Sequence, residues 1–487
     1  MSSLKKQGYT AFAWDFLGKL ASQGTGFIVS IFLARLLEPE DFGLIAMIMV
    51  IVGISQVFTD VGLGSAIVQR RHVRPVHYAS VFYFNITVGA LLTVLLFLSA
   101  PYIASFYNKE LLLVLTQALA CTFIINSFST IQVTKFRKEM NFSAITKVGF
   151  SSSFISGVVG VSLAFYGAGV WSLVAQILLS KLLYTVFIWR ISRWKPALIF
   201  SLRALKQLWG FGFRMFLSGM LDAVFTRLDY IIMGKLFPAA TLGYYQRAQS
   251  LNQLVVQYSS GSLLSVLLPL LSKVQKDLPR LQRITLKAFG VINFVVFLLI
   301  GGLYLVAQEL IVLLFGSKWL SSVEYFQIIA LMGFVYPLSA LLMNVLSSRG
   351  KSKKFLRLEI YKKIIGTLPL PILFYFGIIY FLYARVGISF VAILLNISFV
   401  SEEISLPFFV FVKSIIVQIG VTLLALMPVW YFNTMFETGH FIMLVMKGME
   451  FTFLYFAMNK LFKTESFGFF MEEFQPILIK VKKRVKL

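Results

Sequence analysis

The feature that most constrains this chain is a series of long apolar segments separated by short charged connections. About 20 apolar residues in a helix span the hydrocarbon core of a bilayer. Fourteen such segments run approximately over 11–33, 42–68, 79–102, 112–134, 147–167, 170–189, 208–234, 241–271, 288–308, 323–348, 364–383, 386–401, 411–431 and 440–461. A composition of 58% hydrophobic and 13% charged residues excludes an ordinary soluble domain. We therefore predict an all-α polytopic membrane protein with about 14 transmembrane helices.

The distribution of basic residues tests this assignment, because short cytoplasmic loops carry an excess of Lys and Arg. Of the 45 Lys and Arg residues, 34 lie in alternate connections and in the two terminal segments, whereas five lie in the intervening connections. One missed segment would invert this alternation downstream, so we expect both termini to be cytoplasmic. The connection at 402–413 is an exception, with two acids and one base, and helix boundaries between 386 and 431 are the least certain.

One short element recurs in the sequence with an offset of 200 residues. The stretch RLLEPEDFG, residues 35–43, is matched by KLFPAATLG, residues 235–243, although chance resemblance of two turns is an alternative. Six helices would separate the copies, so the two repeats would share one orientation and be related by an axis along the membrane normal. We predict two six-helix lobes and two extra helices, divided as an N-lobe at 1–207, a C-lobe at 208–410, and helices 13–14 with a basic tail at 411–487.

Three stretches carry a family resemblance: FLARLLEPEDFGLIAM, FTDVGLGSAIVQRR and GYYQRAQSLNQL. Over nearly its full length the chain resembles the polysaccharide-transporter branch of the multidrug/oligosaccharidyl-lipid/polysaccharide exporter superfamily, the Wzx-type oligosaccharide flippases. The resemblance implies a V-shaped pair of lobes around a basic central cavity. It also implies movement of undecaprenyl-diphosphate-linked oligosaccharide from the cytoplasmic to the periplasmic leaflet of a bacterial inner membrane, for exopolysaccharide, capsule or O-antigen synthesis. These motifs do not specify the sugar repeat.

Polar side chains within the apolar segments are few, and each should face a wet cavity or a partner, because a charge at the bilayer centre costs about 2.5–3.5 kcal/mol. Arg suits a diphosphate by its bidentate fork and Lys acts as a point charge, while amides suit sugar hydroxyls. On this basis the predicted cavity residues are Lys19, Arg214, Arg227, Arg247, Gln23, Gln253 and Gln257. The alternatives are a local pair between Asp15 and Lys19, and arginines that snorkel from helix ends.

Two further roles are predicted from the same polar residues. A carrier of a charged headgroup can use the membrane potential, or it can couple to an ion through a carboxylate in the membrane; the candidates for ion coupling are Asp15, Asp222 and Asp229. The sequence does not discriminate between these energy sources. Asp60, Gly62 and Gly64 form a candidate gate or hinge, with close helix packing as the alternative explanation of the glycines.

Several classes of function are disfavoured. No P-loop, metal-ligand spacing or nucleophile motif is present, and there is a single cysteine, so we expect neither an enzyme nor a cofactor or metal site. The positive-inside pattern already explains the charge of +25, so nucleic acid is not an expected partner. Basic residues at 349–363 and in the tail should attract anionic lipids, and a polysaccharide polymerase or assembly protein is a candidate partner. A peptidoglycan-precursor flippase, a multidrug exporter and a non-transporting scaffold remain alternative functions.

Overall fold

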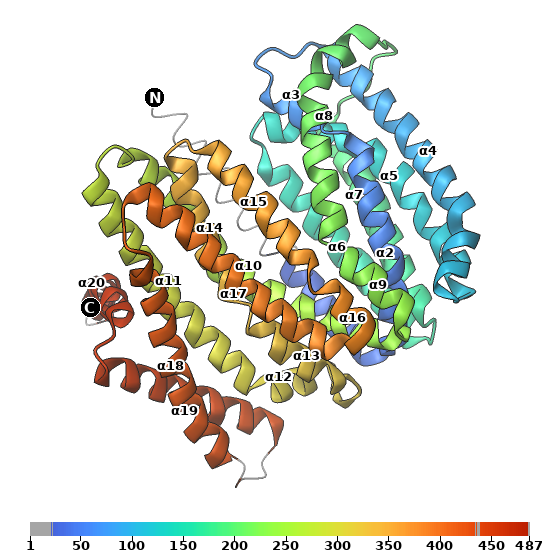
Figure 1. Ribbon diagram of the computed structural model, residues 1–487. Helices are drawn as coiled ribbons and strands as arrows, with labels where there is room; N and C mark the ends of the chain where they lie inside the picture. The colour runs from blue at the N-terminus through green and yellow to red at the C-terminus, as the bar shows by residue number, and fades with distance from the viewer. Residues whose placement is uncertain (1–20, 22, 434, 436–438, 486–487) are drawn as a thin grey trace. The chain divides into compact units, whose positions relative to one another are not determined.

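The computed structural model describes residues 21, 23–433, 435 and 439–485, and every regular element in these residues is a helix (Figure 1). The chain forms two compact units that divide between Gly243 and Tyr244. The predicted lobe boundary at residue 207 rests on the sequence repeat and stays a prediction. The prediction of an all-α polytopic membrane protein is confirmed: ten helices in the described residues are long and apolar enough to cross a membrane.

The described helices of the first unit are the apolar helix Gln23–Leu36, α2 (Pro39–Asp60), α3 (Leu63–Gln69), α4 (Pro75–Tyr107), α5 (Leu111–Lys138), α6 (Phe142–Phe165), α7 (Val170–Ser192), α8 (Leu202–Phe225) and α9 (Leu228–Leu236). Small residues allow close packing at particular points, as at Gly89 of α4, where an added Cβ atom would lie 3.0 Å from the carbonyl oxygen of Phe123 on α5. Helix α5 packs against α4 and α7, and α8 packs against α2 and α3.

The two copies of the repeated turn meet each other in the structure. Helix α2 begins at Pro39 and α10 (Ala239–Lys273) begins at Ala239, which preserves the offset of 200 residues. A Cβ atom added to Gly43 would lie 1.7 Å from the carbonyl oxygen of Ala239, and one added to Gly243 would lie 2.0 Å from the carbonyl oxygen of Pro39. Equivalent positions thus make equivalent contacts, as at a two-fold axis. The reciprocity supports a true repeat over a chance resemblance.

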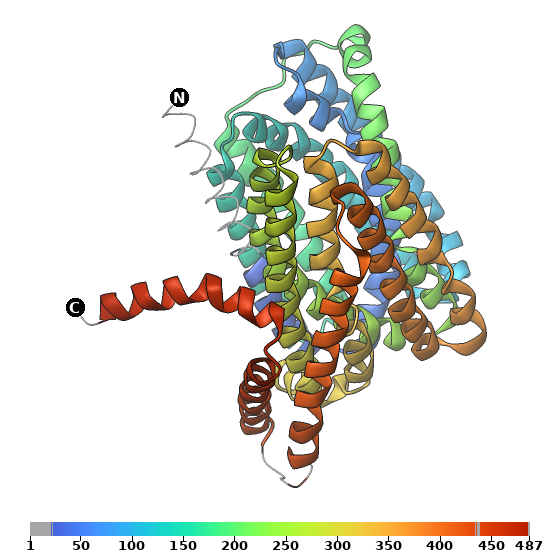
Figure 2. The ribbon, with the colours of Figure 1, turned by 60° about the vertical axis from the view of Figure 1, so that its left-hand side comes forward.

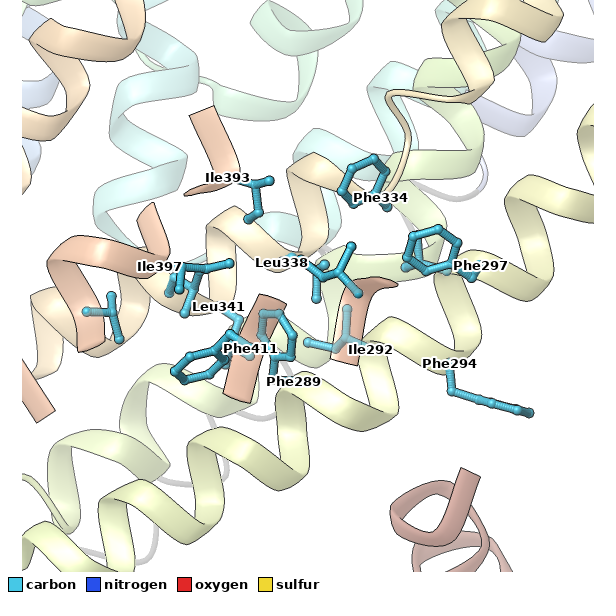
Figure 3. Close-up of a cluster of buried hydrophobic side chains, with 14 of the residues drawn as sticks. Phe289, Ile292, Phe294, Phe297, Phe334, Leu338, Leu341, Ile393, Ile397 and Phe411 are labelled. Carbon is cyan, nitrogen blue, oxygen red and sulfur yellow. The ribbon is translucent and has the colours of Figure 1, made fainter. Parts of the chain in front are cut away.

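The second unit contains most of α10 and the remaining helices: α11 (Leu278–Leu305), α12 (Ala307–Phe315), the 3₁₀ turn η1 (Ser317–Trp319), α13 (Ser321–Ala330), α14 (Val335–Ser348), α15 (Ser352–Thr367), α16 (Leu370–Phe376), α17 (Ile378–Ile404), α18 (Phe408–Asn433), α19 (His440–Leu461) and α20 (Glu465–Val485). Its core lies among α11, α14, α17 and α18 (Figure 3). There Phe289 and Phe411 meet edge to face with ring centroids 4.9 Å apart.

The region whose helix boundaries were least certain from the sequence, 386–431, forms two regular helices joined by a short connection. The predicted segment 386–401 is longer in the structure, where α17 ends at Ile404, Ser405 takes a left-handed conformation with φ 53°, and α18 begins at Phe408. The acids that made the connection at 402–413 exceptional bind basic residues at the end of α14 and in the first turn of α15. Glu403 Oε1 lies 3.3 Å from Arg349 Nε, and Glu403 Oε2 lies 3.2 Å from Lys354 Nζ. The two connections that the charge alternation assigns to one side therefore lie together.

Helices α18 and α19 are fastened to α11 by buried hydrogen bonds. The Tyr455 hydroxyl donates to the Phe294 carbonyl at 2.9 Å and is 2.7 Å from Gln418 Oε1, while the Gln418 amide donates to Asn459 Oδ1 at 2.9 Å. All these groups are buried among apolar side chains, where an unmade hydrogen bond costs about 1–3 kcal/mol. This hydrogen-bond network fixes α18 and α19 to α11.

Candidate functional site

A polar cavity opens within the first unit between α2, α3, α5 and α7, with a volume of about 610 Å³. This volume falls in the range of small-molecule sites, about 300–1,000 Å³. The lining residues are Gln56, Thr59, Gly64, Ser65, Val68, Gln69, Asn126, Ser129, Thr130, Val133, Thr134, Arg137, Lys181 and Tyr184. Most of them are polar, in contrast to the apolar residues that dominate the helices on which they lie.

Helix α5 supplies a stripe of hydrogen-bonding groups to this cavity. Asn126, Thr130 and Thr134 are four residues apart and therefore lie on one face of the helix. The hydroxyl of Thr130 donates to the carbonyl of Asn126 at 3.0 Å, and that of Thr134 donates to the carbonyl of Thr130 at 2.9 Å. Each hydroxyl proton is used within the helix, whereas the oxygen lone pairs still accept hydrogen bonds. The stripe is suited to donors such as sugar hydroxyls.

Two cations border the same space. Arg137 lies in the last turn of α5 and is exposed, while Lys181 lies midway along α7 and is partly buried. Among the lining residues none is acidic. The side chain of Asp60 lies outside the part of the chain that the structure describes. Within the described lining, the positive charge is therefore available to an anion that enters the cavity.

Thr59 adds a buried polar group to the cavity wall. It is 2% exposed, and its hydroxyl has no hydrogen-bond partner among the described residues. A buried hydroxyl without a partner is costly. A polar group in the cavity would relieve this cost, which favours an occupant able to form hydrogen bonds.

A break in the predicted second helix shapes the cavity wall. Helix α2 ends at Asp60, Val61 and Gly62 both take left-handed conformations, and the short helix α3 follows. A Cβ atom at Gly62 would lie 2.3 Å from the carbonyl oxygen of Gly212 on α8, so the break is also a point of close helix packing. Packing alone accounts for Gly62, and a gating role for Asp60, Gly62 and Gly64 stays a prediction.

The basic end of α5 holds α3 in position. Lys138 Nζ donates to the carbonyl oxygens of Ile67 and Arg70, at 2.8 and 2.5 Å. These carbonyls lie at the C-terminal end of α3, where helix acceptors lack partners and the negative end of the dipole favours a cation. Lys138 therefore acts as a C-terminal cap, while its neighbour Arg137 borders the cavity.

Of the predicted residues in the seventh segment, those whose side chains are described do not line this cavity. Arg227 precedes α9 and donates to the carbonyl of Met49 on α2 at 3.2 Å, with its guanidinium against Gly53. Asp229 is buried in the first turn of α9, where its carboxylate accepts the backbone N–H of Tyr230 at 3.0 Å. Asp222 is exposed on α8. Only the backbone of Arg214, also on α8, is described.

Arg247 lies in an aromatic environment in the second unit. It is 6% exposed, and its guanidinium carbon is 4.8 Å from the ring centroid of Phe315 and 5.1 Å from that of Trp319. Nearby, Arg385 donates to the Tyr245 hydroxyl at 2.9 Å. A guanidinium held between ring faces gains cation–π attraction and packing. Within the second unit this geometry is that of a clamp joining α10, α12 and η1.

The structure gives less information about the remaining predicted residues. Gln23 and Gln253 are exposed, and Gln257 lies on α10 with only its backbone described. Asp15 and Lys19 lie outside the described residues. The substrate and ion-coupling roles of all these residues stay predictions.

Sequence reasoning missed Arg137 and the polar stripe of α5, and it did not include Lys181 among the predicted cavity residues. A signal was present: Asn126, Thr130 and Thr134 recur at helical spacing within an apolar segment, and Arg137 falls three residues further on. The stripe was not recognised from the sequence because Ser and Thr are tolerated in membrane helices, where their hydroxyls hydrogen-bond to the backbone of the same helix. Such residues therefore do not by themselves indicate a polar cavity.

The fold is one that solved membrane proteins share. The structure of "Lipid II flippase MurJ, inward closed conformation" matches with a TM-score of 0.74, covering 92% of this chain and 98% of that chain at 14% sequence identity. An inward-facing multidrug resistance MATE family transporter of the MOP superfamily matches with a TM-score of 0.62, covering 80% of this chain and 94% of that chain at 16% identity. At these identities the likeness shows the fold alone.

Sequence comparison gives the family. Residues 32–324 match the family described as "Polysaccharide biosynthesis protein", and the chain belongs to that family. The predicted resemblance to polysaccharide transporters is therefore confirmed.

Three curated relatives carry related names. The teichuronic acid biosynthesis protein TuaB of Bacillus subtilis (strain 168) is 27% identical over 61% of this chain and 62% of its own length. The succinoglycan biosynthesis transport protein ExoT of Rhizobium meliloti (strain 1021) is 25% identical over 63% of this chain and 62% of its own. The lipopolysaccharide biosynthesis protein WzxC of Escherichia coli (strain K12) is 23% identical over 70% of each. The matched stretch thus spans less than two thirds of the first and second of these relatives.

Proposed function

We propose that this protein is a flippase that moves undecaprenyl-diphosphate-linked oligosaccharide repeat units from the cytoplasmic to the periplasmic leaflet of a bacterial inner membrane. Alternating access would expose the site to each side in turn, and the product would feed exopolysaccharide, capsule or lipopolysaccharide synthesis. Membership of a polysaccharide biosynthesis family and the exporter fold support the general role. The observation that carries the substrate class is the polar cavity with two cations and, among its described lining, no acid.

Each part of the proposed substrate has a chemical counterpart in that cavity. Arg137 presents a planar fork that matches phosphate oxygens bidentately, and Lys181 adds a point charge from the facing helix. Hydroxyl and amide groups along α5 would hydrogen-bond the first sugars. By the charge alternation, Arg137 lies at the cytoplasmic end of its helix, where the substrate would enter. The lipid tail would stay in the surrounding bilayer.

Transport of a fluorescent undecaprenyl-diphosphate oligosaccharide in proteoliposomes tests the proposal. Arg137→Gln and Lys181→Gln should each lower the initial rate about 10- to 100-fold, because a hydrogen bond to a charged group contributes about 1.5–3 kcal/mol. The matched control is Lys135→Gln. Lys135 lies two residues from Arg137, and its Nζ is 3.9 Å from a Glu139 carboxylate oxygen rather than in the cavity lining. It should keep the rate within about twofold, as expected for an exposed ion pair.

The outcomes separate the alternative functions. Normal transport by the Arg137→Gln/Lys181→Gln double variant would show that the cavity does not bind the headgroup. A wild-type protein that moves no lipid-linked sugar, yet is required for polysaccharide assembly in cells, would be a scaffold. Transport of a lipid-linked peptidoglycan precursor or of an organic cation in preference to the oligosaccharide would assign the protein to another branch of the superfamily.

A further inference from the structure

The final helix, α20, has an apolar stripe that continues along its whole length. Residues three or four apart share a helix face. By this spacing the stripe comprises Phe467, Phe470, Met471, Phe474, Leu478, Val481 and Val485. A stripe of this kind must be covered by protein or by lipid, because exposed apolar area is costly in water.

The first half of the stripe is covered by the second unit. Phe470 is 9% exposed, and its ring centroid lies 4.6 Å from that of Phe294 on α11. The acids of the same half are also held, since Lys287 Nζ is 3.1 Å from Glu472 Oε2 and 2.8 Å from Glu473 Oε1. This half of α20 is an integral part of the helix bundle.

A tight turn fixes the direction of the helix. Lys463 takes a left-handed conformation with φ 47°, and the Thr464 hydroxyl donates to Asn459 Oδ1 at 2.6 Å. The hydroxyls of Ser466 and Ser414 lie 3.2 Å apart, which ties the first turn of α20 to α18. Within the second unit α20 consequently runs across the direction of α11 and α18 and projects from them (Figure 2). Helix α20 begins at Glu465, shortly after α19 ends at Leu461, and α19 is long and apolar enough to span a membrane. A helix that turns across the bundle where a membrane-spanning helix ends is placed to lie along the membrane surface.

The second half of α20 extends away from the helix bundle, and its charged residues are basic rather than acidic. Phe474 is 44% exposed. Beyond Glu473 the sequence contains no acid, and its basic residues are Lys480, Lys482, Lys483, Arg484 and Lys486. Helical spacing places Lys480, Lys483 and Arg484 away from the stripe and Lys482 beside it. An apolar stripe bordered by cations is the pattern of helices that lie in the interface of an anionic membrane.

We propose that residues 474–485 form an amphipathic anchor that binds the anionic phospholipid surface of the membrane in which the helix bundle sits. The apolar stripe enters the boundary between headgroups and acyl chains, and the four cations of this segment face lipid phosphates. A Lys or Arg near such a surface strengthens binding about fivefold. Because the first half is fixed to α11, the anchor couples the second unit to the lipid surface beside it.

Site-directed fluorescence in nanodiscs tests this anchor on the full-length chain. In a Cys121→Ser background, a bimane label at Leu478→Cys reports the stripe and one at Lys483→Cys reports the opposite face. Discs of phosphatidylcholine alone are compared with discs that contain phosphatidylglycerol, each with a lipid-borne quencher. We expect strong quenching at position 478 in the anionic discs only, and weak quenching at position 483 in both.

A charge variant provides the second measurement. Replacing Lys480, Lys482, Lys483 and Arg484 together with Gln should lower the bound-to-free ratio of a label at position 478 by at least tenfold. The substituted half lies beyond the docked residues, and size-exclusion chromatography with the label at position 478 checks that the bundle remains intact. Equal quenching in neutral discs, an absence of quenching at 478 in anionic discs, or insensitivity to the four substitutions would each overturn the proposal. None of these readouts depends on transport.

Discussion

Cations within the helices have opposite surroundings in the two units. In the first unit, Arg137 and Lys181 border a polar cavity whose described lining contains no acid. In the second unit, Lys447 Nζ lies 2.6 Å from Glu309 Oε1, and Arg247 lies against two aromatic rings. A cation that is already paired stabilises the fold, whereas a cation that faces an open polar cavity is available to a ligand. The difference separates charges that serve structure from charges that can serve transport.

This contrast changes which residues matter for function. The sequence alone does not distinguish Lys181 from Lys447, because each is a single charge within a predicted apolar helix. Only the packing distinguishes them. The side chain of Glu309 is 7% exposed, so its ion pair with Lys447 is shielded from water. No such partner is found for Lys181 among the residues that the structure describes.

The largest expected effect compares these two lysines. Lys447→Met leaves the Glu309 carboxylate buried and unpaired, so the free energy of unfolding should fall by about 3–5 kcal/mol. Lys181→Met removes a charge that has no ion-pair partner among the described side chains and should leave that free energy unchanged or raise it. Reversible denaturation of both variants in bicelles measures the difference. Adding Glu309→Gln to Lys447→Met should recover most of the loss; equal destabilisation by the two single Met variants would erase the proposed contrast.

A smaller effect is expected at the helix break beside the cavity. Gly62 has φ 71°, and an added Cβ atom would meet the backbone of Gly212, so Gly62→Ala should destabilise the protein by about 2–4 kcal/mol. The matched control is Gly210→Ala on α8, where an added Cβ atom has no heavy atom within 4 Å. Thermal unfolding in detergent provides the comparison. Similar melting temperatures for both variants would mean that the break adapts without strain.

The smallest effect concerns the aromatic clamp of the second unit. Arg247→Lys keeps the charge but loses the planar guanidinium that packs on Phe315 and Trp319, so it should cost about 1–2 kcal/mol of stability. Transport, corrected for the amount of folded protein, should remain within about twofold. A loss of specific transport without a loss of stability would instead place Arg247 in the substrate path, as the sequence first suggested.

The sequence predicts the fold well because membrane helices are dictated by local composition. The region 378–433 shows the limit. The predicted segment 364–383 was wrong in running through the break at Gly377, because α17 is continuous from Ile378 to Ile404. The next boundary needed the left-handed Ser405 and the pairing of Glu403 with distant bases. The site was predicted less well. Lys181 was not among the predicted cavity residues, and Arg137 was assigned to a connection, because helical periodicity shows which residues share a face but not which helix that face meets.

The reciprocal contact between Gly43 and Gly243 has a consequence for how the chain can evolve. Each copy of the repeated turn supplies both the glycine and the carbonyl that the other copy needs. A larger side chain at either position would collide with backbone rather than with a movable side chain. The two copies therefore share one steric requirement and cannot drift apart at this point. If the chain arose by duplication, as the predicted repeat implies, this shared requirement would account for the similarity that these nine residues keep.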